Sequence, residues 1–129
     1  MVIAAQAPAH PVILFADDEP GLRALALEVL AEAGFEVLAA ADGFEALDWL
    51  RARPDIQALI SDIRMPNMSG MVLAITAQAH NPSLKVALVT GYVDEALRLM
   101  ELDQWPIWLK PFHIERLPEL AAELCGTCR

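Results

Sequence analysis

The sequence predicts an α/β fold: a parallel β-sheet covered by helices on both faces. From Pro11 onward, short runs rich in β-forming residues alternate with longer stretches of helical period, which is the pattern of such a sheet. Five such units can be counted, and 129 residues suit a single domain. We therefore expect one domain over residues 11–125, a disordered leader at 1–10 and a short tail at 126–129.

The five predicted strands are short apolar runs bounded by turn residues. The first, VILFA at 12–16, has the composition of a fully buried strand. The last, WPIWL at 105–109, contains Pro106, which an edge strand tolerates. The other three are FEVLAA at 35–40, IQALIS at 56–61 and KVALVT at 85–90.

The predicted helices are recognised by apolar spacing and by their end signals. The first has Pro20 near its first turn, where proline is tolerated, and Gly34 at its end. Asp42 is placed to cap the second, GFEALDWLRAR, which stops before Pro54. The others are MVLAITAQAH at 71–80, DEALRLMEL at 94–102 and a last helix from about Leu117 toward Cys125.

Charge and hydropathy exclude two classes of partner. Eighteen acidic residues against nine basic ones give a net charge of -9, which repels a phosphate backbone, so direct nucleic-acid binding is not expected. Charged residues interrupt the apolar runs well before the roughly 20 residues that a membrane span needs. The first eleven residues lack the basic region of a signal peptide. We therefore expect a cytoplasmic protein.

The two cysteines, Cys125 and Cys128, form a CGTC motif almost at the end of the chain. A structural zinc site needs four ligands, and a thioredoxin-like motif stands at a strand-to-helix turn. We therefore favour incidental thiols in a frayed tail over a redox or metal site. A metal shared between two chains would be the exception.

Chemically active side chains stand at the ends of four predicted strands. Asp17 and Asp18 follow the first strand, Asp62 the third and Lys110 the fifth, while Thr90 ends the fourth. Because the carboxyl ends of parallel strands meet at one edge of the sheet, we expect these side chains to lie close together.

Such a set favours metal-assisted phosphoryl transfer. Carboxylates a few ångströms apart raise one another's pKa unless a cation neutralises them, and oxygen-only ligands favour Mg²⁺. Asp62 could then attack phosphorus to form an aspartyl phosphate. Lys110 and the metal would stabilise the phosphoryl oxygens, to one of which the Thr90 hydroxyl would donate a hydrogen bond.

Each residue also has a simpler interpretation. Asp17 or Asp18 could cap the first helix, Asp62 could be a turn residue, Thr90 a β-former and Lys110 a solvated charge. Delivery of all these groups to one edge by four strands favours the chemical interpretation.

Four motifs, in order, carry a family resemblance. ILFADDE, LISDIRMPNMSG, LVTGY and LKPF resemble the motifs of the receiver domain of two-component response regulators, over about residues 11 to 124. The resemblance implies a flavodoxin-like (βα)5 doubly wound parallel sheet with strand order 2-1-3-4-5. It also implies that Asp62 accepts a phosphoryl group from a histidine kinase or a histidine phosphotransfer protein.

The resemblance further implies a ligand set and a backbone geometry. Mg²⁺ would be bound by Asp18, Asp62 and the backbone carbonyl of Arg64, with Asp17 acting mainly through water. The Lys110–Pro111 peptide bond would be cis.

A conformational switch is the last implication of the resemblance. Thr90 would move toward the phosphoryl oxygens and remodel the face formed by helix four, strand five and helix five. That face could bind a downstream protein or a second copy of the chain. The aromatic residue usual three positions before the lysine is here Ile107, between Trp105 and Trp108, so coupling through packing of these three is expected. We interpret the tryptophans as ordinary packing residues.

Two further departures concern the loops. Ser69 replaces a frequent aspartate before Gly70, and we expect this to affect helix capping rather than catalysis. Arg64 and Tyr92 follow Asp62 and Thr90 by two residues, so we expect them to overhang the site and slow hydrolysis of the acyl phosphate.

Other functions remain open at this point. The chain ends soon after the last helix, so we expect a stand-alone receiver or one excised from a longer protein such as a hybrid kinase. An aspartate-nucleophile, Mg²⁺-dependent phosphatase is the alternative, but it would want a second acid where Arg64 stands. A binding module that has lost phosphorylation is a third hypothesis, and the complete acidic set argues against it. We expect a signalling module rather than an enzyme.

Overall fold

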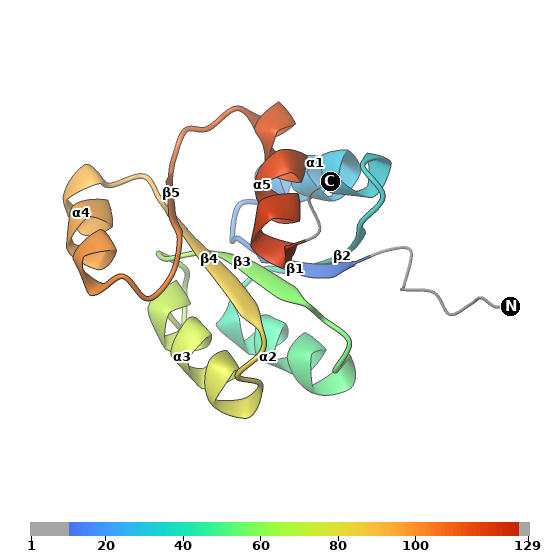
Figure 1. Cartoon of the computed structure of the whole chain (residues 1–129), viewed down its shortest axis with the longest axis horizontal. Helices are drawn as coiled ribbons and strands as arrows, with labels where there is room; N and C mark the ends of the chain where they lie inside the picture. The colour runs from blue at the N-terminus through green and yellow to red at the C-terminus, as the bar shows by residue number, and fades with distance from the viewer. Residues whose placement is uncertain (1–10, 127–129) are drawn as a thin grey trace, which may run out of the picture.

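The chain folds into a five-stranded parallel sheet between two layers of helices. The computed structural model describes residues 11–126. The strands lie in the order β2-β1-β3-β4-β5, which confirms the predicted fold and strand order (Figure 1). Their bounds are β1 Val12–Ala16, β2 Glu36–Ala40, β3 Ala58–Asp62, β4 Lys85–Thr90 and β5 Ile107–Leu109.

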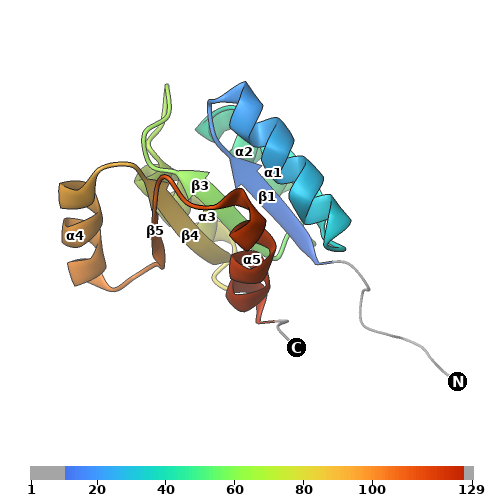
Figure 2. The same ribbon diagram turned by 90° about the horizontal axis from the view of Figure 1, so that it is seen from above.

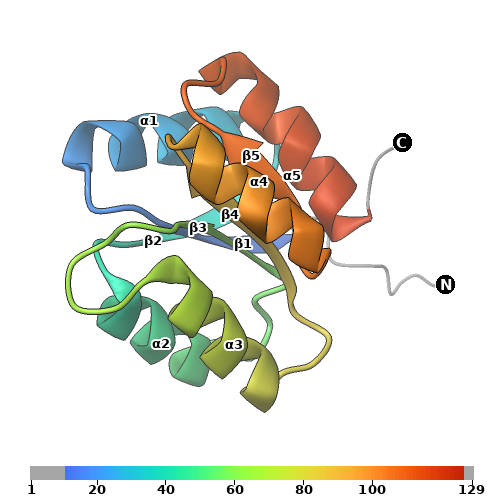
Figure 3. The same ribbon diagram turned by 90° about the vertical axis from the view of Figure 1, so that its left-hand side faces the viewer.

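Five α-helices alternate with these strands, and a 3₁₀ turn, η1, precedes the last one. Two of the helices, α2 and α3, pack side by side on one face of the sheet, and α1 and α5 pack on the other (Figures 1 and 3). The helix α4 lies beside β5 at the edge of the molecule (Figure 2). Their bounds are α1 Pro20–Glu32, α2 Gly43–Ala52, α3 Gly70–His80, α4 Val93–Leu102, η1 Ile114–Arg116 and α5 Leu117–Cys125.

The core consists of two apolar clusters, one on each face of the sheet. Successive strand residues point to opposite faces, so Leu14 joins the cluster under α2 and α3 while Ile13 and Phe15 join the cluster under α1 and α5. Because both faces are covered, β1 is buried along its whole length. The strand ends nearest the site are therefore fixed by the core.

Several element ends follow from local chemistry. Gly34, with φ +100°, follows α1. The Asp42 side chain accepts the Glu45 N–H at the start of α2, which confirms the predicted cap. The Ser69 side chain accepts the Val72 N–H at the start of α3, so this position has a capping role, in line with the expectation for Ser69. The expected strand at 105–109 is shorter than predicted and begins at Ile107, because Pro106 has no N–H to donate to a ladder.

Trp105 and Trp108 are packing residues, as predicted. Trp105 is buried, and its Nε1 donates a hydrogen bond to Gln78 Oε1 at 3.0 Å. Trp108 packs on the cluster under α1 and α5, and Ile107 on the opposite cluster.

Within residues 11–126, no helix has both the length and the apolar character needed to cross a membrane. The predicted leader at 1–10, and Cys128 in the predicted tail, lie outside the described residues.

Candidate functional site

Three carboxylates meet at the carboxyl edge of the sheet. Asp62 is the last residue of β3, which begins two residues later and ends one residue later than the predicted strand. Asp17 and Asp18 follow β1, which pairs with β3. One oxygen from each carboxylate lies within 4.8 Å of the others. Asp17 is buried, Asp62 is partly buried and Asp18 is exposed. This oxygen-only set, open to solvent on one side, suits a hard divalent ion such as Mg²⁺.

Lys110 supplies a cation to this cluster from the end of β5. Its Nζ donates hydrogen bonds to Asp17 Oδ2 at 3.0 Å and to Asp62 Oδ2 at 3.2 Å. The Lys110–Pro111 bond is cis, as the family resemblance implied. Lys110 is therefore an ion-pair partner of two acids rather than a solvated surface charge.

Both carboxylate oxygens of Asp17 accept hydrogen bonds: Oδ2 from Lys110, and Oδ1 from the Glu19 N–H at 2.9 Å. The backbone carbonyl of Asp17 accepts a hydrogen bond from Arg23 Nη1 at 2.8 Å. The residue that caps α1 is Glu19, and no side chain makes the cap hydrogen bond. The capping interpretation of Asp17 and Asp18 is therefore wrong.

The charges in the cluster shift one another's titration. Burial raises the pKa of Asp62 above its usual value, the Lys110 ammonium opposes this shift and the Asp17 carboxylate adds to it. Burial alone would lower the pKa of Lys110, but the hydrogen bond to Asp17 and the charge of Asp62 outweigh it, so this pKa is raised. Ionisation of Asp62 is therefore less favourable in the folded protein than in water, and a nearby cation makes it more favourable.

Thr90, at the end of β4, belongs to a second group of polar contacts. It is 1% exposed, and its Oγ1 donates a hydrogen bond to Glu95 Oε1 at 2.7 Å and accepts the Tyr92 N–H at 3.1 Å. Arg64 Nε lies 3.6 Å from the same Glu95 oxygen, and the Arg64 guanidinium stacks 3.9 Å above the Tyr92 ring. Arg64 and Tyr92 thus form a stacked pair beside the site.

Glu95 is a residue at the site that the sequence analysis did not identify. It lies in the first turn of α4 and points back to the end of β4. The sequence feature that could have pointed to Glu95 is the short interval between Thr90 and the predicted helix start. This interval keeps the acidic residues of the first helical turn close to the end of the strand.

The two groups share a hollow of about 440 Å³ that is open to solvent. It is lined by Asp62, Arg64, Thr90, Gly91, Tyr92 and Lys110. The structure thus gathers the Asp62 carboxylate, the Thr90 hydroxyl and the Lys110 ammonium around a space large enough for a phosphoryl group.

The loop after Asp62 is held tightly against the strand. A Cβ on Gly70 would clash with the backbone carbonyl oxygen of Asp62 and meet Ile63 Cα at 3.0 Å. On the far side of the loop, Asn67 Nδ2 donates to Asp42 Oδ2 at 3.1 Å. Gly70 is therefore required for the close approach that places Asp62.

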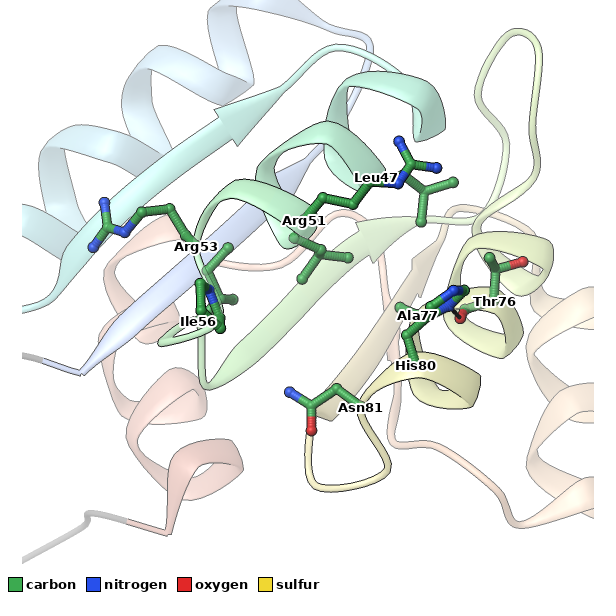
Figure 4. Close-up of a pocket in the computed structure, with 10 residues that line it drawn as sticks. Leu47, Arg51, Arg53, Ile56, Thr76, Ala77, His80 and Asn81 are labelled. Carbon is green, nitrogen blue, oxygen red and sulfur yellow. Dashed lines mark hydrogen bonds between the residues drawn. The ribbon is translucent and has the colours of Figure 1, made fainter.

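A second hollow, of about 400 Å³, lies between α2 and α3 and away from the acidic cluster (Figure 4). Its floor includes Leu47, Ile56 and Ala77. Its two arginines, Arg51 and Arg53, pair with Asp48 and Asp55. It therefore lacks the groups that the acidic site brings together.

Comparison with known proteins identifies the family. The sequence model of the response regulator receiver domain matches residues 13–122. The chain belongs to this family. The receiver domain is a module of two-component signalling. The family resemblance inferred from the four sequence motifs is therefore confirmed.

Curated relatives of this receiver domain include short and long proteins. It is 32% identical over 108 residues to sporulation initiation phosphotransferase F of Bacillus subtilis, covering 81% of this chain and 86% of that protein. It is 33% identical to the response regulator receiver protein CpdR of Brucella abortus, covering 88% of it. It is 37% identical to the C4-dicarboxylate transport transcriptional regulatory protein DctD of Rhizobium meliloti, but spans only 25% of that protein's length.

Solved receiver structures are similar to most of this chain. Chemotaxis protein CheY4 of Vibrio cholerae has a TM-score of 0.80 at 27% identity, with 90% of this chain and 99% of that chain covered. Response regulator TrrA of Thermotoga maritima, solved in complex with Mg²⁺ and BeF, has a TM-score of 0.77 at 32% identity, with 88% and 98% covered.

Proposed function

We propose that Asp62 of this receiver domain is the residue that accepts the phosphoryl group. The observation that carries the proposal is the Lys110 ammonium, which lies 3.0 Å from Asp17 and 3.2 Å from Asp62 beside a solvent-open hollow. In this hollow an anionic phosphoryl group would meet a fixed cation as it approaches Asp62.

The proposed transfer exchanges one bond to phosphorus for another. An Asp62 carboxylate oxygen attacks phosphorus, and the bond from phosphorus to the donor atom breaks. With a phosphohistidine donor, the imidazole nitrogen leaves with the electron pair and takes its proton from solvent. Lys110 stabilises the charge on the transferred oxygens.

Asp18, Asp62 and the Arg64 carbonyl are the proposed Mg²⁺ ligands, with Asp17 acting through water. The carboxylate oxygens within 4.8 Å of one another support this assignment. When bound, Mg²⁺ would supply positive charge to the phosphoryl oxygens. Asp17 would meanwhile hold Lys110 in place, since its Oδ2 accepts a hydrogen bond from Lys110 Nζ.

The proposed phosphodonor is a histidine kinase or a histidine phosphotransfer protein, as expected for a receiver domain. The proposed output surface is the α4-β5-α5 face. Its support is the exposed apolar side chains of Val93, Leu97, Met100 and Leu109 on α4 and β5. A downstream protein or a second copy of the chain would cover them. The cytoplasmic location expected from the sequence stays a prediction.

The phosphatase alternative is not favoured. The position two residues after Asp62, where that mechanism would want an acid, holds the exposed Arg64, which pairs with Glu95. The family match also points to signalling rather than to hydrolysis of external esters.

The test is the intact mass of the protein after incubation with acetyl phosphate, with Mg²⁺ or with EDTA, for wild type and Asp62→Asn. We expect wild type to gain one phosphoryl group only with Mg²⁺, and the variant to gain none. Equal labelling of both proteins would overturn the assignment. So would a folded wild type that neither acetyl phosphate nor an active histidine kinase labels.

A further inference from the structure

The Thr90 hydroxyl can donate one hydrogen bond, and in this structure it donates that bond to the Glu95 carboxylate. The Thr90 Oγ1 to Glu95 Oε1 distance of 2.7 Å is that of a charge-assisted hydrogen bond. Thr90 is 1% exposed and the Glu95 side chain 18% exposed, so water competes weakly for either group. A hydroxyl donates only once, so Thr90 cannot serve Glu95 and a phosphoryl oxygen together.

Glu95 itself is held in place from two sides. Its Oε1 accepts the Thr90 proton and faces Arg64 Nε at 3.6 Å, and Arg64 in turn stacks on Tyr92. The Tyr92 N–H donates to the Thr90 hydroxyl oxygen, which closes the set of contacts. All four residues converge at the carboxyl end of β4, and Arg64 comes from the loop after Asp62.

We propose that Glu95 is a positioning residue that competes with the phosphoryl group for the Thr90 hydroxyl. The inference rests on the proposed phosphorylation of Asp62. In the unphosphorylated protein, Glu95 retains Thr90. A phosphoryl group on Asp62 offers a stronger anionic acceptor and repels the Glu95 carboxylate. Thr90 then changes partner, and Glu95 loses its hydrogen-bond donor.

The proposal gives the switch a direct route to α4. Glu95 belongs to the first turn of α4, and only Ala96 and Leu99 of that helix are buried. Loss of the Thr90–Glu95 bond therefore removes a polar anchor from a helix with a small buried face.

Two substitutions separate the hydrogen bond from the charge. Glu95→Ala removes both, whereas Glu95→Gln removes the charge and keeps a carbonyl oxygen that can accept from Thr90. Asp94→Ala is the matched control, because Asp94 is an exposed acid in the same helical turn. A Thr90→Ala background removes the hydroxyl for which Glu95 is proposed to compete.

The first readout needs neither metal nor phosphodonor. The χ1 rotamer of Thr90 is measured by NMR from three-bond couplings to its methyl carbon. We expect one rotamer in wild type, Asp94→Ala and Glu95→Gln, and rotamer averaging in Glu95→Ala. An unchanged single rotamer in Glu95→Ala would overturn the proposal, whether or not the domain is phosphorylated.

The second readout is the Kd of beryllofluoride, which stands in for the phosphoryl group, in saturating Mg²⁺. We expect Glu95→Ala to bind about threefold to tenfold more tightly than wild type, the scale of one hydrogen bond. Glu95→Gln should gain less and Asp94→Ala less than about twofold. In the Thr90→Ala background only the charge repulsion remains, so the gain from Glu95→Ala should be clearly smaller than in the presence of the hydroxyl.

The outcomes distinguish the two proposals. An equal gain in the presence and absence of the Thr90 hydroxyl would mean that Glu95 acts through its charge alone, which would overturn the inference. If wild type bound no beryllofluoride and took up no phosphoryl group, the proposed function would fail, and the Thr90 rotamer would still decide the role of Glu95 in the resting protein.

Discussion

The acidic half of the site and its hydroxyl half are built in different ways. Asp17 and Asp62 stand at the ends of neighbouring buried strands, and Lys110 pairs with both. Thr90 also ends a buried strand, but its partner Glu95 belongs to α4, which lies at the edge of the molecule (Figure 2). Most of the apolar side chains of α4 face outward, whereas α3 buries four of its residues.

This difference assigns different tasks to the two halves. In the acidic half, charges are fixed by the same strands that form the core, so the placement of the Asp62 carboxylate is part of folding. In the hydroxyl half, a few polar contacts join a strand end to a weakly buried helix, so a change of partner costs little elsewhere. Substitutions in the first half should therefore alter stability, and substitutions in the second should alter rates and switching.

The largest effect is expected from Gly70→Ala, which attacks the placement of Asp62. Its new Cβ would meet the Asp62 carbonyl, and backbone cannot yield cheaply. We expect a loss of roughly 3 kcal/mol in the free energy of unfolding, measured by urea denaturation. The control is Gly21→Ala, where a Cβ meets nothing within 4 Å in a helix, and it should lie within about 1 kcal/mol of wild type. Equal stability of the two variants would contradict the close approach.

The next effect concerns the cation of the acidic half. Lys110→Met leaves Asp17 and Asp62 without their shared partner, and we expect a loss of about 2 kcal/mol in EDTA. Lys85→Met is the control, because Lys85 is exposed at the start of β4. Adding Asp62→Asn to Lys110→Met should recover part of the loss. No recovery would show that charge repulsion is not the cause.

A smaller, pH-dependent effect is expected from Asp62→Asn without metal. Because the pKa of Asp62 is raised in the folded protein, its charged form opposes folding above that pKa. The uncharged variant should melt roughly 3 °C higher than wild type at pH 7. The gain should shrink as the pH falls and disappear below about 4, the pKa of an unfolded aspartate. A gain that does not change with pH would have another cause.

The hydroxyl half should respond in rate rather than in stability. Arg64 stacks on Tyr92, and both residues line the hollow, so Arg64→Ala and Tyr92→Ala should each speed dephosphorylation, by about threefold, through easier access of water. Their unfolding free energies should stay within about 0.5 kcal/mol of wild type. Arg51→Ala, an exposed arginine on α2, is the control. Rates no faster than wild type would refute the shielding role.

The same division explains what could be predicted from the sequence. The strands and the gathering of Asp17, Asp18, Asp62, Thr90 and Lys110 at one edge followed from apolar patterning, because the carboxyl ends of parallel strands lie at the same edge of the sheet. The strand order followed from the family resemblance that the four motifs carry. The role of Glu95 did not follow, because a side-chain contact between a strand end and a helix depends on how the connecting loop turns. The start of β5 was misjudged because the apolar run continues through Pro106.

The central claim is that Asp62 carries the phosphoryl group. Borohydride reduction of the phosphorylated protein converts an aspartyl phosphate into homoserine, and peptide mass spectrometry then locates the converted residue. The account predicts homoserine at position 62 in wild type treated with acetyl phosphate and Mg²⁺, and none in EDTA. Conversion at Asp17 or Asp18 with position 62 unchanged would contradict it.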